Sequence, residues 1–231
     1  MPATMLDWPG RLAASLFLSG CGFACPYCHN PHLLSPVDEP ADWAAFAAHV
    51  AEKRAWLDGV VVTGGEPTDD PDLRPLLLAI AEMGVPVKLD TNGSRPALVR
   101  KLIAEGLLTA IAVDIKATPL HYAAVTGWDG AADAVSETVA VVIASGIEHE
   151  FRTTAYPGAV SPDDFEHIAH SLRGGRLYAI QQFRPVGTVS RGDAFVELYA
   201  DETLLDAAQA CSRHLPCVVR GLSALEMGAD E

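Results

Sequence analysis

Short apolar runs alternate with helix-like patterns along nearly the whole chain, and this alternation restricts the possible folds more than any other feature. Residues 60–63 read as a short buried strand, and the segment after it carries Leu73, Leu77 and Ile80 on one helix face. Strands that alternate with helices indicate a parallel sheet with helical crossovers. The predicted strands are 12–18, 60–63, 85–89, 109–115, 148–154 and 177–183, and the predicted helices are 42–57, 73–83, 96–105, 131–145, 162–172 and 202–212.

The number of these units limits how the sheet can close. About six βα units fit in the 231 residues, whereas a closed eight-unit barrel typically takes about 250 residues. We therefore predict an α/β fold with a partial, open (β/α)6 TIM-like barrel, and an open doubly wound sheet is the alternative. We found no linker rich in Gly, Pro or Ser. Residues 1–231 are predicted to form a single domain, with a core at about 12–185 and a C-terminal extension at about 186–231.

Charge and hydropathy argue against two classes of partner. The formal net charge is −14 and the chain has no basic run, which does not suit a nucleic-acid binder. No stretch reaches the roughly 18 to 20 apolar residues that cross a bilayer. The segment from Arg11 to Cys21 has the layout of a bacterial lipoprotein signal, but Asp7 stands where such a signal needs positive charge. We expect a cytoplasmic protein with neither nucleic-acid nor membrane partners.

Three cysteines stand close together in the loop directly after the first predicted strand. Cys21, Cys25 and Cys28 have the spacing C-x3-C-x2-C. A disulfide would leave one thiol unpaired. Structural zinc usually takes four ligands; His29 adjoins Cys28 too closely to share an ion with it, but His32 can complete a set. Iron–sulfur cubes normally take four thiolates, and three would leave one iron open to a substrate. Cys211 and Cys217 are interpreted as small buried apolar residues.

Polar residues also follow three of the other predicted strands, and these strand ends share one rim of the predicted sheet. The second strand ends in Gly64-Gly65-Glu66, whose acidic surroundings suit a cationic ligand better than a phosphate. The next two strands end in Asp90-Thr91 and in Asp114-Ile115-Lys116. Each segment can equally be an ordinary turn or a solvated ion pair. Strand alternation nevertheless sends Asp114 and Lys116 to the same side.

These motifs together resemble a known family. The C-x3-C-x2-C spacing with Tyr27 before the last cysteine resembles the radical S-adenosylmethionine (SAM) enzymes. Within that family, the chain is similar to the glycyl-radical-enzyme activases, and most of all to the activating proteins of anaerobic ribonucleoside-triphosphate reductase. The similarity runs from about residue 7 to residue 185, and the segments that carry it are Asp7-Trp8-Pro9-Gly10, Cys28-His29-Asn30 and Gln182-Phe183-Arg184.

The resemblance implies a radical SAM domain and a set of residues for each cofactor. One 4Fe–4S cluster is held by Cys21, Cys25 and Cys28, with Tyr27 beside it, and SAM binds the open iron. The segment Gly64-Gly65-Glu66 binds the amino group of SAM. The residues that hold the carboxylate of SAM, partly through a bound monovalent cation, are Asp90, Thr91, Asp114 and Lys116. Arg184 binds the carboxylate or the ribose; it stands near a position where pyruvate formate-lyase activases have histidine, which shifts the assignment away from them.

The same resemblance implies the activity. The chain would reductively cleave SAM to a 5′-deoxyadenosyl radical and generate a glycyl radical on an anaerobic ribonucleoside-triphosphate reductase, with a flavodoxin or ferredoxin as electron donor. No side-chain general base is needed for this chemistry, because the cofactors carry it. One alternative is a radical SAM enzyme that acts on another glycyl radical enzyme, such as pyruvate formate-lyase, or on a small molecule. The alternative from another class is a non-catalytic zinc or electron-transfer protein.

Overall fold

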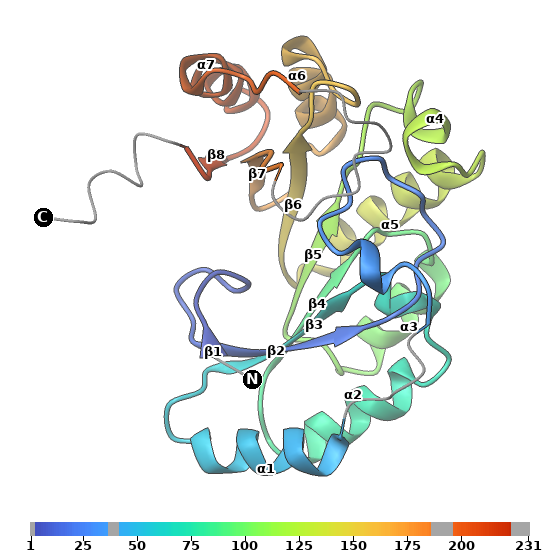
Figure 1. Ribbon diagram of the computed structural model, residues 1–231, viewed down its shortest axis with the longest axis vertical. Coiled ribbons are helices and arrows are strands. Elements are labelled where there is room, and N and C mark those ends of the chain that lie inside the picture. Colours follow the sequence, from blue (N-terminus) through green and yellow to red (C-terminus); the bar gives the residue numbers. More distant parts are fainter. Residues whose placement is uncertain (1–2, 37–41, 186–195, 223–231) are drawn as a thin grey trace, which may run out of the picture.

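The computed structural model describes residues 3–36, 42–185 and 196–222, and its strands form one eight-stranded sheet in the order of the chain (Figure 1). The first strand pairs with the second in antiparallel orientation, and all later neighbours are parallel. The strands are β1 (Ala3–Thr4), β2 (Ala13–Leu18), β3 (Gly59–Gly64), β4 (Val87–Thr91), β5 (Ala110–Asp114), β6 (Glu148–Ala155), β7 (Tyr178–Gln182) and β8 (Cys217–Arg220).

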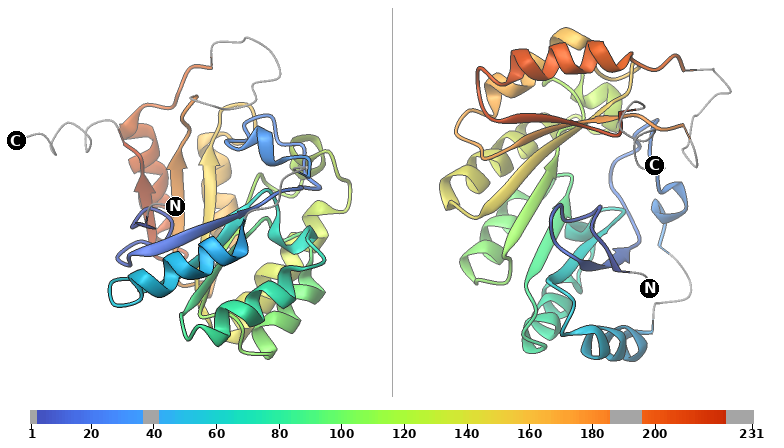
Figure 2. Two further views of the ribbon diagram at one scale, coloured as in Figure 1. Left: turned by 60° about the horizontal axis from the view of Figure 1, so that its bottom comes forward. Right: turned by 90° about the vertical axis from the view of Figure 1, so that its left-hand side faces the viewer.

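The helices cover the outer face of this sheet, as the views in Figures 1 and 2 show. Because crossovers between parallel strands are right-handed and the strand order never reverses, every crossover helix falls on the same side. The helices are α1 (Trp43–Lys53), α2 (Leu73–Glu82), α3 (Pro96–Ala104), α4 (Tyr122–Thr126), α5 (Ala131–Ser145), α6 (Pro162–Ser171) and α7 (Asp201–Cys211), with 3-10 turns η1 (Pro31–Leu33) and η2 (Pro67–Asp69).

This arrangement is the open partial barrel that the alternation predicts. The sheet ends at β1 on one side and at β8 on the other, and these two strands do not pair within the described residues. Figure 2 shows the sheet curving between these ends. The doubly wound alternative is wrong, because that fold requires a point where the strand order reverses. None of the helices in the described ranges is long and apolar enough to span a membrane.

The outward and inward faces of the strands carry different residues. Outward side chains such as Val60, Val62 and Leu89 join the main core beneath the helices, where Leu77 and Ile80 of α2 also lie. The inner face instead carries small and charged residues. A second, small apolar cluster inside the barrel consists of Trp8, Ala13, Val61 and Ala110.

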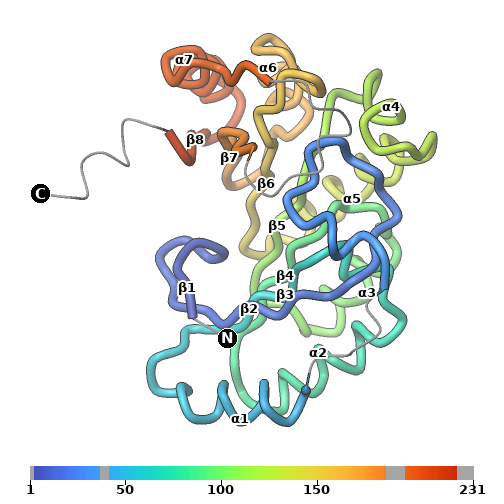
Figure 3. The backbone as a smooth tube through the Cα atoms, viewed as in Figure 1, coloured from blue at the N-terminus to red at the C-terminus, as the bar shows by residue number. Residues whose placement is uncertain are grey.

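The segment before β2 closes the amino end of the barrel. Trp8 is only 2% exposed and donates its indole N–H to Oε1 of Glu148 at 3.1 Å, at the start of β6. Arg11 lies 4.5 Å above the Trp8 ring and also pairs with Glu148 at 2.7 Å. The chain then turns into β2 and reaches the loop at the carboxyl ends of the strands (Figure 3). The functional residues predicted from the sequence are therefore expected at the opposite, carboxyl end.

Candidate functional site

A cavity of about 320 Å³ lies at the carboxyl ends of the strands, inside the barrel. It brings together the cysteine loop after β2 and the polar ends of β3, β4 and β5. Such a position suits a ligand site in a barrel of this type. The predicted site residues that line it are Cys21, Cys25, Tyr27, Cys28, Gly64, Gly65, Glu66, Asp90, Thr91, Asp114 and Lys116.

The cysteine loop is fixed by backbone hydrogen bonds at both of its sides. The amide of Gly20 donates to the carbonyl of Leu33 at 2.8 Å. The amide of Ala24 donates to the carbonyl of Thr126 at 2.8 Å, at the end of α4. The sequence analysis did not predict α4, and the structure shows what it does: it holds the middle of the loop that carries the thiols.

The three thiols are half-buried and face the cavity. The sulfur of Cys21 accepts from the amide of Phe23 at 3.4 Å and lies 3.9 Å from Nδ2 of Asn92. Burial raises the pKa of Cys21 to about 11. Burial also raises the pKa of Cys25, and the charge of Lys116 opposes the shift. Thiolates in this place need a compensating positive charge, which a metal cluster provides. The donor set fits a cluster held by three thiolates.

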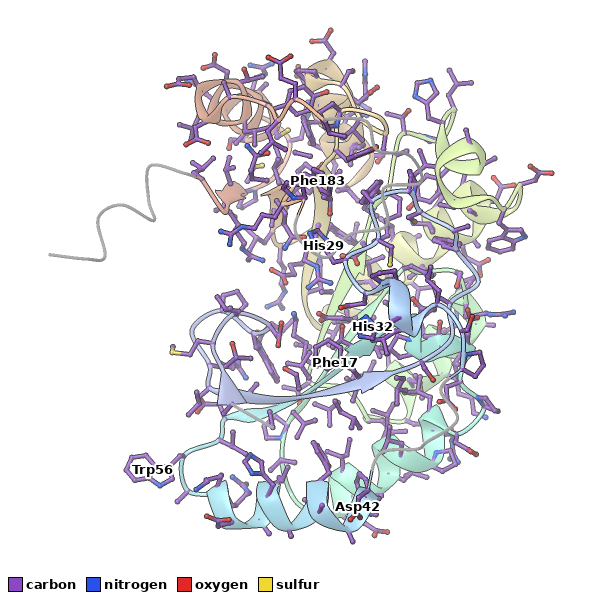
Figure 4. The ribbon with its side chains drawn as sticks, viewed as in Figure 1. Phe17, His29, His32, Asp42, Trp56 and Phe183 are labelled. Atoms are coloured by element: carbon purple, nitrogen blue, oxygen red, sulfur yellow. The ribbon has the colours of Figure 1, made fainter. Side chains whose placement is uncertain are left out.

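The zinc interpretation lacks support in the structure. Within residues 3–36, 42–185 and 196–222, no three His, Cys, Asp or Glu side chains are arranged to hold a single metal ion. His32, the expected fourth ligand, is exposed and does not line the cavity. His29 does line it, with its ring 5.9 Å from the ring of Phe183 (Figure 4). Burial lowers the pKa of His29.

Two glycines at the end of β3, the last strand residue Gly64 and its successor Gly65, are required by close backbone packing. A Cβ on Gly64 would lie 2.2 Å from the carbonyl oxygen of Leu18, and one on Gly65 would lie 2.2 Å from that of Gly20. The sequence analysis expected these glycines to make room for a ligand. They also make room for the cysteine loop, because the amide of Glu66 donates to the carbonyl of Gly20 at 2.7 Å.

The carboxylate of Glu66 is 1% exposed and already bonded to protein donors. Its Oε1 accepts from the amide and the hydroxyl of Thr68 at 3.0 and 2.5 Å and from the hydroxyl of Thr91 at 2.6 Å. Its Oε2 accepts from the amide of Asn92 at 2.5 Å. Burial raises the pKa of Glu66, and these hydrogen bonds oppose the shift. Glu66 therefore ties the end of β3 to the end of β4, with acceptor capacity left only on Oε2.

A group of mostly half-buried charges lines the same cavity as the thiols and forms a charged wall, and its central member is Arg152 of β6. The Nε of Arg152 donates to Oδ1 of Asp114 at 2.8 Å, and its Nη1 donates to Oδ2 of Asp90 at 2.9 Å. Lys116 pairs with Oδ2 of Asp114 at 3.1 Å. Burial alone would raise the pKa of Asp114, but Arg152 and Lys116 outweigh it and hold that pKa well below its usual range. Burial alone would lower the pKa of Lys116, but Asp114 and Cys25 raise it.

The expected monovalent cation does not fit this arrangement. All four carboxylate oxygens of Asp90 and Asp114 have a cationic partner, the fourth contact being Oδ1 of Asp90 to Nζ of Lys88 at 2.9 Å. A further cation would have to share these oxygens with Lys88, Lys116 and Arg152, against the repulsion of three neighbouring positive charges. The guanidinium of Arg152, which bridges the two carboxylates, supplies the positive charge that such an ion would bring.

Aromatic rings close the cavity between the cysteine loop and β7. Tyr27 is 3% exposed, donates its hydroxyl to the carbonyl of Lys116 at 3.1 Å, and lies 5.0 Å from the ring of Tyr156. Tyr156 in turn meets Phe183 edge-on, also at 5.0 Å. Arg184, the next residue, is exposed and does not line the cavity. The guanidinium of Arg184 lies beside Gly221 instead: a Cβ on Gly221 would be 3.7 Å from Nε and from Nη2 of Arg184. The structure therefore does not bring Arg184 to the predicted site.

Several cavity residues were missed in the sequence analysis. Arg152 and Thr154 lie on the inner face of β6, and Gln181 lies on the inner face of β7. Strand alternation places Arg152 and Thr154 on one face, and this was the signal available. Cys211 and Cys217 lie at the end of α7 and the start of β8, as free thiols that share a hydrogen bond, and they lie outside the cavity lining.

Comparison with known proteins agrees with this geometry. Residues 15–172, more than half of the chain, match the radical SAM superfamily. The chain belongs to the radical SAM superfamily. Enzymes of this superfamily use SAM and a 4Fe–4S cluster. The matched segment contains the three thiols, the ends of β3 to β5 and Arg152, but not β7 or β8.

Individual relatives agree with the superfamily match. A Methanocaldococcus jannaschii protein provisionally named a glycyl-radical enzyme activating enzyme is 31% identical over 191 residues, which cover 78% of this chain and 76% of that protein. A pyruvate formate-lyase-activating enzyme of Streptococcus mutans is 33% identical over 93 residues, 37% of this chain and 35% of that enzyme.

Solved structures share the fold at low sequence identity. Streptococcus suis SuiB, in its crystal structure with S-adenosylmethionine, aligns with a TM-score of 0.71 and 15% identity over 91% of this chain. The chain spans only about half of SuiB, 51% of its length. This likeness supports the radical SAM barrel and nothing finer.

Proposed function

We propose that this protein is a radical SAM activase that generates a glycyl radical on an anaerobic ribonucleoside-triphosphate reductase. The observation that carries the proposal is the cavity itself, which is lined both by three thiols with C-x3-C-x2-C spacing and by the charged wall around Arg152. The Methanocaldococcus jannaschii relative, matched over about three quarters of both chains, supports an activating role.

Cys21, Cys25 and Cys28 would hold the 4Fe–4S cluster. When bound, the cluster and SAM supply the chemistry: one electron from a flavodoxin or ferredoxin cleaves the sulfonium carbon–sulfur bond, giving methionine and a 5′-deoxyadenosyl radical that takes a hydrogen atom from a glycine of the partner. The chain's own residues bind and orient SAM and keep water and other hydrogen donors away. Tyr27, which lines the cavity, serves this second purpose, and the ring of Tyr156 packs against it with the ring centroids 5.0 Å apart.

Arg152 and Lys116 of the charged wall support an orientation of SAM in which its carboxylate faces them. In the described residues, no protein group accepts from Nη2 of Arg152, and Nζ of Lys116 makes one hydrogen bond, to Asp114. These donors suit the carboxylate of SAM. The carbonyls near Gly64 and Gly65, together with Oε2 of Glu66, suit its amino group. Arg184 is left out of this proposal because it lies outside the cavity lining.

Two local resemblances bear on which glycyl radical enzyme is the target. The resemblance of Gln182-Phe183-Arg184 to reductase activases favours the reductase. The second candidate target is pyruvate formate-lyase, which is favoured by the local match to the Streptococcus mutans activating enzyme. The expected surroundings are the cytoplasm, where a flavodoxin or ferredoxin can serve as reductant.

The first experiment tests the chemistry without a partner. Anaerobically reconstituted protein receives dithionite and SAM, and 5′-deoxyadenosine and methionine are quantified by mass spectrometry. We expect both products, and we expect Cys25→Ala to abolish cluster binding and both products. Cys217→Ala is the matched control, because Cys217 lies outside the cavity lining. Zinc in place of iron in anaerobically purified protein, or products from the Cys25 variant, would overturn the proposal.

The second experiment identifies the target. The reduced activase and SAM are incubated with each candidate glycyl radical enzyme, and the glycyl radical is quantified by electron paramagnetic resonance. A signal with the reductase and none with pyruvate formate-lyase is the expected result. The reverse pattern would keep the radical chemistry and replace the target.

A further inference from the structure

A second group of buried charges lies below the cavity, toward the amino end of the barrel, and it includes a residue of the last strand. Glu150 of β6 is 7% exposed and points inward. Its Oε2 accepts from Nη2 of Arg220, on β8, at 2.7 Å. Its Oε1 lies 3.3 Å from Nζ of Lys88 and 3.8 Å from Nη1 of Arg152. Glu150 therefore has three cationic neighbours, and one of them is the arginine of the cavity wall.

The three cations lie at different distances from Glu150, and Arg220 is the nearest. Lys88 donates to the carbonyl of Asp7 at 2.6 Å and to Oε1 of Glu150 at 3.3 Å, and its Nζ forms an ion pair with Oδ1 of Asp90 at 2.9 Å. Arg152 lies too far from Glu150 for a hydrogen bond and donates instead to Asp90 and Asp114. Arg220 makes the short contact to Glu150.

Removal of Arg220 would leave the ionised Glu150 under-compensated beside Arg152. Burial alone would raise the pKa of Glu150, but Lys88, Arg220 and Arg152 together lower it, so this carboxylate is charged at neutral pH. A buried carboxylate that loses its best partner recruits another donor, because an unpaired charge in the interior is costly. Lys88 is already shared among Asp7, Asp90 and Glu150, so the further donor within reach is the guanidinium of Arg152.

We propose that Arg220 is a positioning residue for the SAM site, acting through Glu150 to keep the free donors of Arg152 directed into the cavity. The inference rests on the proposed SAM binding and adds to it a role for β8. This strand lies beyond the segment that matches the superfamily, which ends at residue 172.

The test is a double-mutant cycle on the SAM dissociation constant of the reconstituted full chain. Arg220→Met is expected to weaken SAM binding about tenfold, which corresponds to about 1.4 kcal/mol. In a chain that already carries Glu150→Gln, the same change is expected to have almost no effect, because the competing carboxylate is gone. A purely structural role for Arg220 predicts similar losses in both backgrounds.

Two further variants guard against misfolding. Arg220→Lys keeps a charge opposite Glu150 and is expected to recover most of the affinity. Arg213→Met is the matched control: it removes an ion pair at 2.8 Å between the turn after α7 and Glu166 of α6, outside the barrel, and should leave SAM binding unchanged. Iron content and the unfolding temperature of each variant are measured alongside.

The outcomes separate the two proposals. If the unchanged chain does not bind SAM, the proposed function fails and this inference falls with it. If the chain binds SAM and Arg220→Met binds it equally well, the inference is overturned and the proposed function stands. If Glu150→Gln does not fold, an Arg220→Lys variant as weak as Arg220→Met would likewise overturn it.

Discussion

A methyl group added at Gly65 should separate the end of β3 from the cysteine loop. A Cβ at this position would lie 2.2 Å from the carbonyl oxygen of Gly20 and 2.8 Å from that of Leu33. Ordinary contact begins at 3.4 Å, so the two backbone segments must move apart by about 1.2 Å. Neither neighbour is a flexible side chain that could give way.

The cost of this movement follows from the bonds it breaks. The amide of Gly65 donates to Leu18 at 2.8 Å, and the amide of Glu66 donates to Gly20 at 2.7 Å. Each is worth about 1 kcal/mol net, and residual overlap adds about 1–2 kcal/mol. We expect Gly65→Ala to lower the free energy of unfolding by about 3–4 kcal/mol. For a chain of this length, that is a fall of about 6–16 °C in the unfolding temperature.

The assay combines stability with metal content. Thermal unfolding is followed by circular dichroism under anaerobic conditions, and iron and sulfide are measured after reconstitution. We expect Gly65→Ala to bind less iron, because the thiol-bearing loop loses its support. Gly22→Ala is the matched control in the same loop, since its Cβ would meet only the side-chain oxygen of Asp69, at 3.2 Å. Equal unfolding temperatures and equal iron content in the two variants would refute the reasoning.

Three further predictions concern the charged wall and the opposite end of the barrel. Lys116→Ala should keep its iron and bind SAM about tenfold more weakly, since one charge-assisted contact is lost; an unchanged dissociation constant by equilibrium dialysis would remove Lys116 from the site. Replacing potassium with tetramethylammonium should leave SAM binding unchanged, because each carboxylate oxygen of Asp90 and Asp114 already has a cationic partner; a strong potassium dependence would show that an ion enters. Burial lowers the pKa of His149, whose Nε2 accepts from the amide of Arg176 at 3.0 Å. The neutral imidazole therefore stabilises the fold above about pH 6.5, the usual pKa of histidine. This stability is lost as the pH falls toward the lowered pKa of His149. Urea unfolding at pH 7.5 and 5.5 should therefore show a larger loss for the unchanged chain than for His149→Gln, and equal losses would contradict the assignment.

The convergence of the site was predictable because the fold class fixes where strand ends meet. Parallel strands in chain order place all their carboxyl ends at one rim, so Asp90, Asp114 and the cysteine loop had to lie together once the alternation was recognised. Gly64 and Gly65 were recognised as positions where the backbone comes close to another group, but the cysteine loop was not recognised as that group. The carbonyl of Gly20 is distant in sequence, and no local pattern reports it.

The missed and misplaced residues share a physical reason. Arg152 shares one face of β6 with Glu148, Glu150 and Thr154, and strand alternation groups these side chains, but the sequence does not say whether this polar face turns into the barrel or toward solvent. Arg184 was expected at the rim, but β7 ends at Gln182 and Phe183 turns into the aromatic group, which leaves Arg184 outside the cavity lining. The strand β1 has two residues, too few for any periodicity to show.

The strictly sequential pairing of strands has a consequence for how the protein is made. Each parallel strand finds its partner in the next one synthesised, so the sheet can grow as the chain leaves the ribosome. The cysteine loop comes with the first of these strands, and Arg220 comes with the last. At about 5–20 residues per second, about 10–40 s pass between the emergence of Cys28 and that of Arg220. During that interval the wall around the thiols is incomplete. Insertion of iron then has to wait until the wall is complete, or it has to compete with oxidation of the thiols.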